Sequence, residues 1–453
     1  MTQRTLDHID ATLEERLARL FEFIRIPSIS TDPGHSADVA RAAAWLAGIL
    51  RGMGAHAQVH ETAGHPMVTG HLPGPTDAPH VLFYGHYDVQ PPDPLELWTT
   101  DPFEPTLRDV GHDTEITGRG ASDDKGALMT FVEACRAVVE TEGTMPLRVS
   151  FLFEGEEESG SRSLPGFLET AAESLACDVI LVCDTDMWDR ETPAVTTMFR
   201  GLVGQEVTIR AGDRDLHSGM FGNAAANALA VMADVLAALR TDDGGVALPG
   251  FYDGISPPPE SWGTLDFDEA AFLGNVGLSV PAGEADQSIL AQVWARPSCE
   301  VHGIWGGYMA PGFKTVIPCE AHAKLSFRLA AGQDPVAIRE TFQSFVRDRI
   351  PADCTVEFSD HGLAPAWAME AANPYLAPTL EALTAEWGQA TTCGTGGSIP
   401  IIGALKDSLG VDALLVGFAR FDNRIHSPNE KYDLSSFHKG MRSWVRILAE
   451  LSR

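Results

Sequence analysis

The segment SFLFEGEEESGS, residues 150–161, joins a short apolar run to four glutamates, Glu154, Glu156, Glu157 and Glu158. The apolar run predicts a buried strand, so the carboxylates are expected at the rim of a core, where burial and mutual repulsion disfavour their charged forms. A bound cation would relieve both effects, because it attracts the carboxylates and replaces their lost hydration. The segment therefore predicts that other cation ligands come together at the same place.

Histidines and aspartates follow other strand-like runs of the chain or precede a helix. The residues of this kind are His86, Asp88, Asp123, Asp186 and His426. In open α/β sheets ligands bind beyond the carboxyl ends of the strands, so we expect these side chains along one edge of a sheet. Imidazole and carboxylate groups without thiolates are typical ligands of zinc and similar divalent ions. The pattern therefore predicts a metal site.

Two further roles follow from neighbours in the sequence. Asp88 comes two residues after His86, so its carboxylate could orient the imidazole ring through a hydrogen bond. Glu157 and Glu158 are adjacent, and extended backbone would point their side chains in opposite directions. One of them could then bind metal while the other moves protons.

Each part of this pattern also has an ordinary structural explanation. A run of glutamates in an acidic chain is more often a solvated surface, and a histidine after a strand is more often a hydrogen-bonded structural residue. The segment CDTDMWD lacks the glycine and closing glutamate of a calcium loop, and HETAGH spaces its histidines five apart, unlike zinc-binding helices. The sequence contains no P-loop, dinucleotide fingerprint or nucleophile elbow. The joint occurrence at successive strand ends is what favours a metal site.

The elements that must position these residues alternate between helix and strand in the first part of the chain. Apolar residues spaced for one helix face are Leu6, Ile9, Leu13, Leu17, Leu20 and Ile24. A second helix is expected from Ser36 to about Gly54, and a third begins near DDKGALMTFVEACRAVV. The runs HVLFYG, LRVSFLF and DVILVC predict strands. Near-continuous apolar strands that alternate with helices predict an α/β fold with a mostly parallel sheet covered on both faces.

The pattern changes between residues 199 and 369. Strand, helix, strand, helix and strand follow one another there, interrupted by a long irregular stretch from Thr241 to about Pro297. This order predicts a smaller α+β domain inserted into the larger one. The expected domains are therefore residues 1–198 plus 370–453, which carry the metal ligands, and residues 199–369.

Composition narrows the function further. The 453 residues are enough for two or three domains, and 63 acidic against 32 basic residues give a formal net charge of −31. Such a charge disfavours binding to nucleic acids and anionic membranes. Seven cysteines form no C-x-x-C pair, and no run of eighteen apolar residues or signal-like N-terminus is present. We therefore expect a soluble, cytoplasmic protein without a disulfide framework.

Taken together, the segments GHYDVQP, GRGASDDKG, EGEEESGS, DTD and HSPNEKY resemble the signature set of the M20 family of dinuclear zinc peptidases. The resemblance covers nearly the whole chain and is strongest to the branch that contains cytosolic non-specific dipeptidase and carnosinase. It implies that His86 binds one metal, His426 the other, and Asp123 both. It further implies that Glu158 and Asp186 each supply a ligand to one of the two metals, that Glu157 is the general base and that Asp88 orients His86. In this family the peptide bond corresponding to Asp123–Asp124 is cis.

The same resemblance assigns substrate-binding roles. The inserted domain resembles a ferredoxin-like lid and dimerisation domain, through which His217 and Thr315 would reach the active site of the partner subunit in a homodimer. Arg328 would bind the substrate carboxylate, and Ser398 would come from the catalytic domain. The chain departs from the branch at Glu156, where an apolar residue is usual, and in TTCGT before Gly396, where an arginine and a glutamate are usual.

These features predict a metallopeptidase with two divalent ions per chain, zinc first, with manganese or cobalt as alternatives. The expected substrates are dipeptides or short peptides with a free C-terminal carboxylate, cleaved by a metal-bridging hydroxide with Glu157 as general base. An N-acyl amino-acid amidohydrolase of the same family needs the same groups and remains an alternative. A catalytically silent, metal-stabilised binding protein is the alternative of another class. Glu157 argues against it, because holding a metal requires no spare carboxylate.

Overall fold

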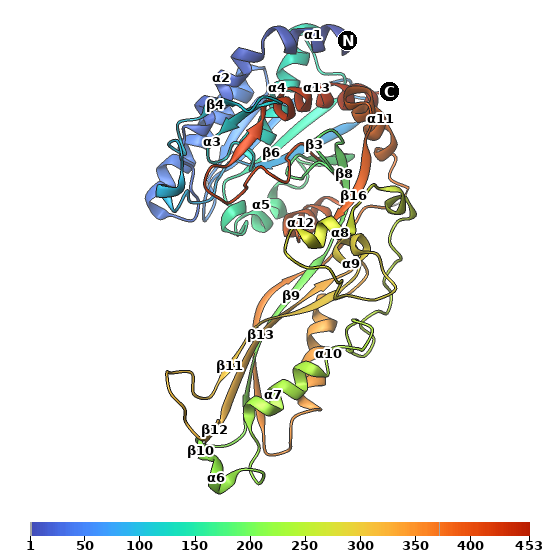
Figure 1. The fold of residues 1–453 in the computed structure, drawn as a ribbon. Helices are drawn as coiled ribbons and strands as arrows, with labels where there is room; N and C mark the ends of the chain where they lie inside the picture. Colours follow the sequence, from blue (N-terminus) through green and yellow to red (C-terminus); the bar gives the residue numbers. More distant parts are fainter. Residues whose placement is uncertain (1, 371) are drawn as a thin grey trace. The chain divides into compact units, whose positions relative to one another are not determined.

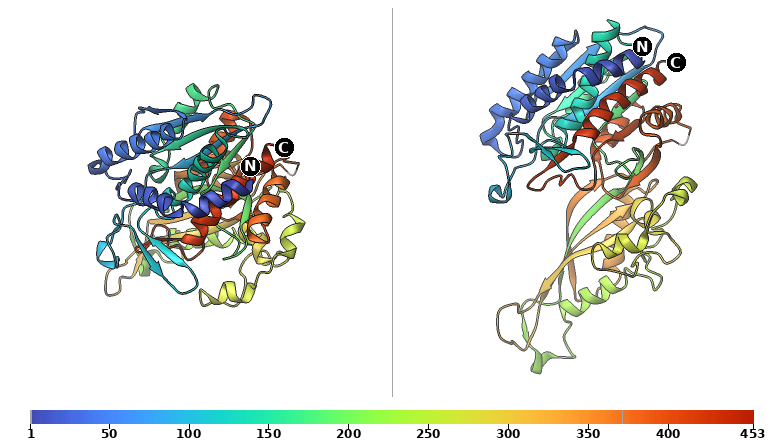
Figure 2. Two further views of the ribbon diagram at one scale, coloured as in Figure 1. Left: turned by 90° about the horizontal axis from the view of Figure 1, so that it is seen from above. Right: turned by 45° about the horizontal axis from the view of Figure 1, so that its top comes forward.

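The computed structural model describes residues 2–370 and 372–453 and divides into two compact units (Figures 1 and 2). The first unit comprises Met1–Thr197, Met369–Cys393 and Ala404–Arg453, and the second comprises Met198–Ala368 and Gly394–Gly403. Within the described ranges, no helix combines the length and the apolar composition that a membrane crossing requires.

The first unit is built on a mixed sheet with the strand order β1-β2-β6-β3-β7-β17-β8. The central strands β6, β3, β7 and β17 run parallel, whereas β1, β2 and β8 pair antiparallel at the two sides. The bounds are β1 His56–His60, β2 Met67–Leu72, β3 His80–His86, β6 Arg148–Glu154, β7 Val179–Val182, β8 Ala194–Phe199 and β17 Ala413–Gly417. The α/β class with a mostly parallel sheet is thus confirmed, and the three predicted apolar runs are β3, β6 and β7.

Helices cover this sheet. They are α1 Thr2–Ala11, α2 Leu13–Ile24, α3 Ser36–Gly52, α4 Lys125–Glu142, α5 Leu164–Ala171, α11 Leu376–Trp387 and α13 Leu434–Leu451. Helix α13 packs against α1, α4 and α11. The rings of Phe83 and Phe131 stack with centroids 4.0 Å apart, and Trp444 meets both edge-on. This aromatic cluster packs strand β3 against helices α4 and α13. Because β3 ends at His86 and α4 begins just after Asp123, the packing helps to position both residues.

The first helix differs from its prediction. The periodicity from Leu6 to Ile24 predicts one helix, but the structure divides it at Thr12 into α1 and α2. The Thr12 hydroxyl donates to the carbonyl of His8 at 2.7 Å and accepts from Nε of Arg16 at 3.0 Å. A threonine that hydrogen-bonds the preceding turn competes with the regular helical pattern, which apolar spacing does not reveal.

The second unit contains an antiparallel sheet with the order β11-β13-β9-β14. Its elements are β9 Gly201–Arg210, α7 Ala228–Ala237, β11 Ser298–Gly306, β13 Glu320–Leu329, α10 Pro335–Arg347 and β14 Thr355–Ala364. Residues of α7 and α10 share one apolar core with alternate residues of β9 and β13. The predicted alternation of strands and helices is present, and the structure adds β11 at the edge of the sheet, where the sequence analysis assigns no element.

Short elements complete both units. In the first, β4 Thr106–Asp109, β5 Thr114–Thr117 and β18 Lys431–Asp433 form a small sheet beside the loops that carry Asp123 and His426. In the second, β10 Leu216–His217 pairs with β12 Val316–Ile317 next to α6 Ser218–Phe221, at one end of the unit (Figure 1). The irregular stretch contains η4 Glu260–Thr264, α8 Glu269–Gly274 and α9 Ile289–Trp294.

The segment Gly394–Gly403 groups with the second unit, whereas the sequence assigns it to the domain of the metal ligands. The hydroxyl of Ser398 donates to the carbonyl of Arg200 at 2.6 Å and accepts from Nη1 of Arg328 at 3.0 Å. These contacts tie the segment to Arg200, which lies just before β9, and to β13, and its position in the sequence does not show this.

Candidate metal centre

His86 ends strand β3 and is 1% exposed. Its Nδ1 lies 3.2 Å from the carbonyl oxygen of Asp88 and 3.4 Å from Oδ1 of the same residue. Both are acceptors, so Nδ1 can donate its hydrogen to Asp88, and Nε2 is the nitrogen that would bind a metal. Asp88 therefore holds the His86 ring through Nδ1, which leaves Nε2 free to bind a metal.

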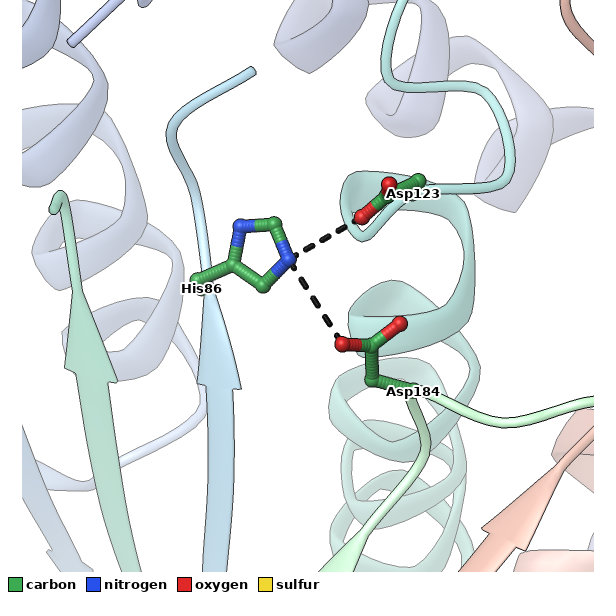
Figure 3. A group of neighbouring side chains, drawn as sticks. All are labelled: His86, Asp123 and Asp184. Atoms are coloured by element: carbon green, nitrogen blue, oxygen red, sulfur yellow. Dashed lines mark ion pairs between the residues drawn. The ribbon is translucent and has the colours of Figure 1, made fainter. Parts of the chain in front are cut away.

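The other nitrogen of this ring faces carboxylates (Figure 3). Nε2 of His86 lies 3.0 Å from Oδ1 of Asp123 and 3.8 Å from Oδ2 of Asp184. This buried nitrogen makes no well-formed hydrogen bond within the described residues. An imidazole nitrogen and two carboxylates that converge in this way form a donor set that fits a divalent ion.

A second group shares Asp123. Nε2 of His426 lies 2.9 Å from Oδ2 of Asp123 and 3.3 Å from Oε2 of Glu158. Asp123 thus turns one oxygen toward His86 and the other toward His426. Ligand atoms from His86, Asp123 and Asp184, and from Asp123, Glu158 and His426, form two clusters compact enough to hold a metal. The Asp123–Asp124 peptide bond is cis, as the family resemblance implies.

Glu430 holds the loop that carries Asp123. Its buried carboxylate accepts hydrogen bonds through Oε1 from the backbone N–H groups of Ser122 at 2.9 Å and Asp123 at 3.0 Å. Through Oε2 it accepts from the N–H of Gly120 at 3.0 Å and from Nη1 of Arg119 at 2.7 Å. Because Glu430 belongs to the same loop as His426, these bonds connect the two loops from which both clusters take ligands.

Asp88 also holds the glutamate segment. Its carboxylate accepts from the backbone N–H of Glu157 at 3.2 Å and of Glu158 at 3.0 Å. The segment is not extended as expected, because Glu157–Ser159 forms a short 3-10 helix. Successive side chains on such a helix point about 120° apart, so the two glutamates still diverge, though through a turn.

The two glutamates differ in their contacts. Glu158 lies beside His426 and accepts a hydrogen bond from Nε2 of Gln90 at 2.6 Å. Glu157 belongs to neither metal-binding cluster. Burial raises the pKa of Glu157, and the neighbouring Glu158, Asp123 and Asp88 raise it further against the opposing charge of His86. A carboxyl with a raised pKa and no metal partner is suited to accept and release protons.

The structure differs from the sequence in its choice of aspartate after β7. Asp184 lies in the cluster with His86 and Asp123, whereas Asp186 belongs to neither cluster and bridges to Ala419 through its backbone. We therefore propose Asp184, in place of the expected Asp186, as the ligand that follows β7. Burial raises the pKa of Asp184 well above its usual value, and the charges of Asp123 and Asp124 add to this. The missed signal is its position as the first carboxylate after the strand ends.

This proposal gives a prediction. Asp184→Asn should weaken metal binding at the His86 cluster at least tenfold, because an amide oxygen carries no charge to offset the desolvation of the ion. Asp186→Asn is the matched control and should bind metal within about twofold of the wild type. Metal titration of both metal-free variants checks this, and stronger loss with Asp186→Asn would restore the original assignment.

The charge of the two clusters is unbalanced. Among the described residues no lysine or arginine pairs with Asp88, Asp123, Glu157, Glu158 or Asp184, and the ion pairs that these carboxylates make are with the imidazoles of His86 and His426. Behind them, burial raises the pKa of Asp124 to about 7 and that of Glu154 to about 8. The side chains around the clusters thus supply no cation to match this concentration of acidic groups, which favours a bound metal ion.

Glu156, where an apolar residue is usual in the similar dipeptidases, has a structural role. Oε1 of Glu156 accepts from the backbone N–H of His65 at 3.0 Å, and Oε2 accepts from that of Ser163 at 2.9 Å. Glu156 therefore lies outside both clusters and joins two loops.

The predicted substrate-binding residues form two pairs within the second unit. His217 ends β10, accepts from the N–H of Gly219 through Nδ1 at 3.0 Å, and is followed by Ser218, whose N–H donates to the carbonyl of Thr315 at 3.1 Å. Arg328 donates to Ser398 near the other end of β13. His217 and Thr315 adjoin the segment that leads into Glu320, which lies eight residues before Arg328. Glu320 and Arg328 are about 27 Å apart along β13. The two pairs therefore lie toward opposite ends of this strand.

Similar sequences and structures are known for nearly the whole length of this chain. The model of "Peptidase family M20/M25/M40" matches residues 82–450. The sequence is 27% identical to Cys-Gly metallodipeptidase dug1 of Schizosaccharomyces pombe over 98% of this chain and 97% of the relative. It is 28% identical to Beta-Ala-His dipeptidase of Rattus norvegicus over 100% and 96%. The structure resembles that of an M20 family metallo-carboxypeptidase, Sso-CP2 from Sulfolobus solfataricus, with a TM-score of 0.80, 28% identity and coverage of 97% and 99%.

Proposed function

Because this chain belongs to peptidase family M20/M25/M40, we propose that it is a dipeptidase that holds two divalent metal ions, one at each cluster of ligands. The observation that carries the proposal is Asp123, whose two carboxylate oxygens face His86 and His426 separately. A carboxylate shared in this way could hold two divalent ions, each with one of the two imidazoles. His86, Asp123 and Asp184 would hold one ion, and Asp123, Glu158 and His426 the other.

The imidazole and carboxylate donors suit zinc, with manganese or cobalt as alternatives. Bound ions of this kind supply Lewis acidity, which lowers the pKa of water and polarises a carbonyl group. Glu157 would accept the proton of the attacking water at its carboxylate. It would then pass that proton to the leaving nitrogen as the peptide bond breaks. Asp88 would hold Nδ1 of His86 and the backbone of Glu157 in place throughout.

Arg328 would bind the C-terminal carboxylate of a dipeptide or short peptide, because a guanidinium group matches a carboxylate with two parallel hydrogen bonds. Ser398, which accepts from Arg328, would fix that guanidinium. A dipeptide spans only about 7 Å, far less than the separation of Arg328 and His217 within one chain. We therefore propose that His217 and Thr315 serve the active site of the partner subunit in a homodimer.

Two alternatives to a dipeptidase can be distinguished from it by experiment. An N-acyl amino-acid amidohydrolase would use the same water, base and carboxylate grip. A silent metal-binding protein would not need Glu157, which contacts neither lysine nor arginine within the described residues. A cytoplasmic location also stays a prediction, supported by the free thiols of Cys135, Cys177, Cys183, Cys299, Cys319, Cys354 and Cys393.

The test is a substrate panel. Purified protein is stripped of metal, loaded with zinc, manganese or cobalt, and assayed against dipeptides, tripeptides and N-acetyl amino acids. We expect hydrolysis of dipeptides that is lost without metal and restored by its return. Hydrolysis confined to N-acetyl amino acids would favour the amidohydrolase, and the absence of turnover with every metal would favour the binding protein.

A further inference from the structure

A pocket of about 440 Å³ lies within the second unit, between the edge strand β11 with its neighbour β13 and the irregular stretch that precedes β11. Four arginines line it, Arg200, Arg240, Arg296 and Arg328. Arg328 is the residue proposed above to bind the substrate carboxylate, so this pocket adjoins the carboxylate-binding position. Its lining is therefore placed to contact the C-terminal side chain of the substrate.

Two of these arginines are held by neutral groups. Arg328 donates to the hydroxyl of Ser398. The guanidinium of Arg200 donates to the carbonyl of Gly396 at 3.3 Å and to the carbonyls of Gln292 and Arg296 at 3.3 and 3.4 Å. Within the described residues, neither guanidinium has a carboxylate partner. Both guanidinium groups are thus held by hydrogen bonds to neutral groups, and the lining carboxylate of Glu300 forms an ion pair with neither.

The neighbouring Arg296 shows the contrast. Its guanidinium binds the carboxylate of Glu284 through two hydrogen bonds of 2.6 and 2.8 Å. Among the described residues, the same pocket therefore contains one arginine paired with a carboxylate and three that are not, because Arg240 donates to the carbonyl of Ala282. In a protein with 63 acidic and 32 basic residues, an unneutralised guanidinium pair is unexpected unless an anion binds there.

The electrostatics of Arg200 support this reading. Burial and the charge of Arg328 together lower the pKa of Arg200 to about 10, while Glu300 acts in the opposite direction. Gly396 permits the close approach, since a Cβ at that position would lie 2.9 Å from Nη2 of Arg200. Two like charges in one partly buried pocket repel, and a ligand with two negative charges would offset both.

We propose that this pocket binds the C-terminal residue of a substrate that carries a second carboxylate, so that the enzyme prefers dipeptides ending in aspartate or glutamate. Arg328 takes the α-carboxylate and Arg200 takes the side-chain carboxylate. This inference rests on the proposed dipeptidase function. The specific prediction is that Arg200 determines the preference, whereas Arg328 is needed for any peptide with a free C-terminus.

The test compares isosteric pairs of substrates with metal-loaded enzyme. The value of kcat/KM for Ala-Glu should exceed that for Ala-Gln at least tenfold, and Ala-Asp should exceed Ala-Asn in the same way. Arg200→Gln should reduce each ratio to within about twofold of unity by slowing the acidic substrates, and Arg200→Lys should retain part of the preference. Arg347→Gln, which removes an arginine of α10 outside the pocket lining, should leave the ratios unchanged.

The outcomes test the dipeptidase function and the pocket's preference for acidic residues separately. Failure to cleave any dipeptide would overturn the proposed function itself. Cleavage of dipeptides with equal kcat/KM for Ala-Glu and Ala-Gln in the wild type would overturn the pocket inference alone, whatever the variants do. A preference for acidic residues that survives Arg200→Gln in a variant with unchanged melting temperature would also overturn it, because another group would then bind the second carboxylate.

Discussion

Replacing Glu157 by glutamine is expected to lower kcat by about 10² to 10⁴-fold while both metal ions stay bound. The amide has nearly the shape of the carboxylate but cannot accept a proton from water. Since Glu157 belongs to neither ligand cluster, its loss should leave metal affinity and substrate binding close to those of the wild type.

The adjacent Glu158 provides the matched comparison. Its carboxylate lies 3.3 Å from Nε2 of His426, so Glu158→Gln should release metal from that cluster first and lose activity as a consequence. Steady-state kinetics and metal content measured on both variants decide the assignment. If Glu157→Gln loses the metal and Glu158→Gln keeps it, the roles of the two glutamates are reversed.

Mixing two inactive variants is expected to restore activity. In His217→Ala the base is intact, and in Glu157→Ala the partner's histidine would be intact. If His217 serves the other subunit, each heterodimer contains one complete site, and random exchange of equal amounts should recover about a quarter of the wild-type activity. Each variant alone, taken through the same exchange, should remain inactive.

A control variant makes the result specific. His361, an exposed histidine on β14 of the same unit, has no role in the proposed site, so His361→Ala should turn over substrate like the wild type. Mass spectrometry must show that heterodimers have formed. No recovery in verified heterodimers would place His217 in the site of its own subunit or outside catalysis.

The fold and most of the ligand positions are predictable from the sequence because strand ends are marked in it. The runs that become β3, β6 and β7 are continuous and apolar, and His86 and the glutamates follow them directly. Apolar continuity reports burial on both faces of a sheet, and the ends of parallel strands meet at one edge. The residues that directly follow such runs are therefore brought together, and this does not depend on the conformation of the loops.

The choice between Asp184 and Asp186 could not be made in this way. The two residues are separated by one position, so the alternation of side chains along a strand gives both the same direction. What distinguishes them is that β7 ends at Val182 and that Asp186 bridges to Ala419, a contact between segments far apart in the sequence. The 3-10 turn at Glu157 likewise depends on Asp88, whose carboxylate accepts the backbone N–H groups of the two glutamates.

The separation of Arg328 from His217 was also hidden in the sequence. Both residues belong to one predicted domain, and only the register of β13 shows that they lie near its opposite ends. Strand β11 escaped prediction because its residues SCEVHGIWG are mostly half-buried or exposed at the sheet edge, so they show no clear alternation.

The number of metal ions bound per chain tests the central claim most directly. Metal-free protein titrated with zinc and freed of excess ion should contain about two equivalents by elemental analysis, as the sharing of Asp123 between two clusters requires. His426→Ala should reduce this to about one equivalent, with the ion at the His86 cluster retained. A single equivalent in the wild type, unchanged by His426→Ala, would contradict the account.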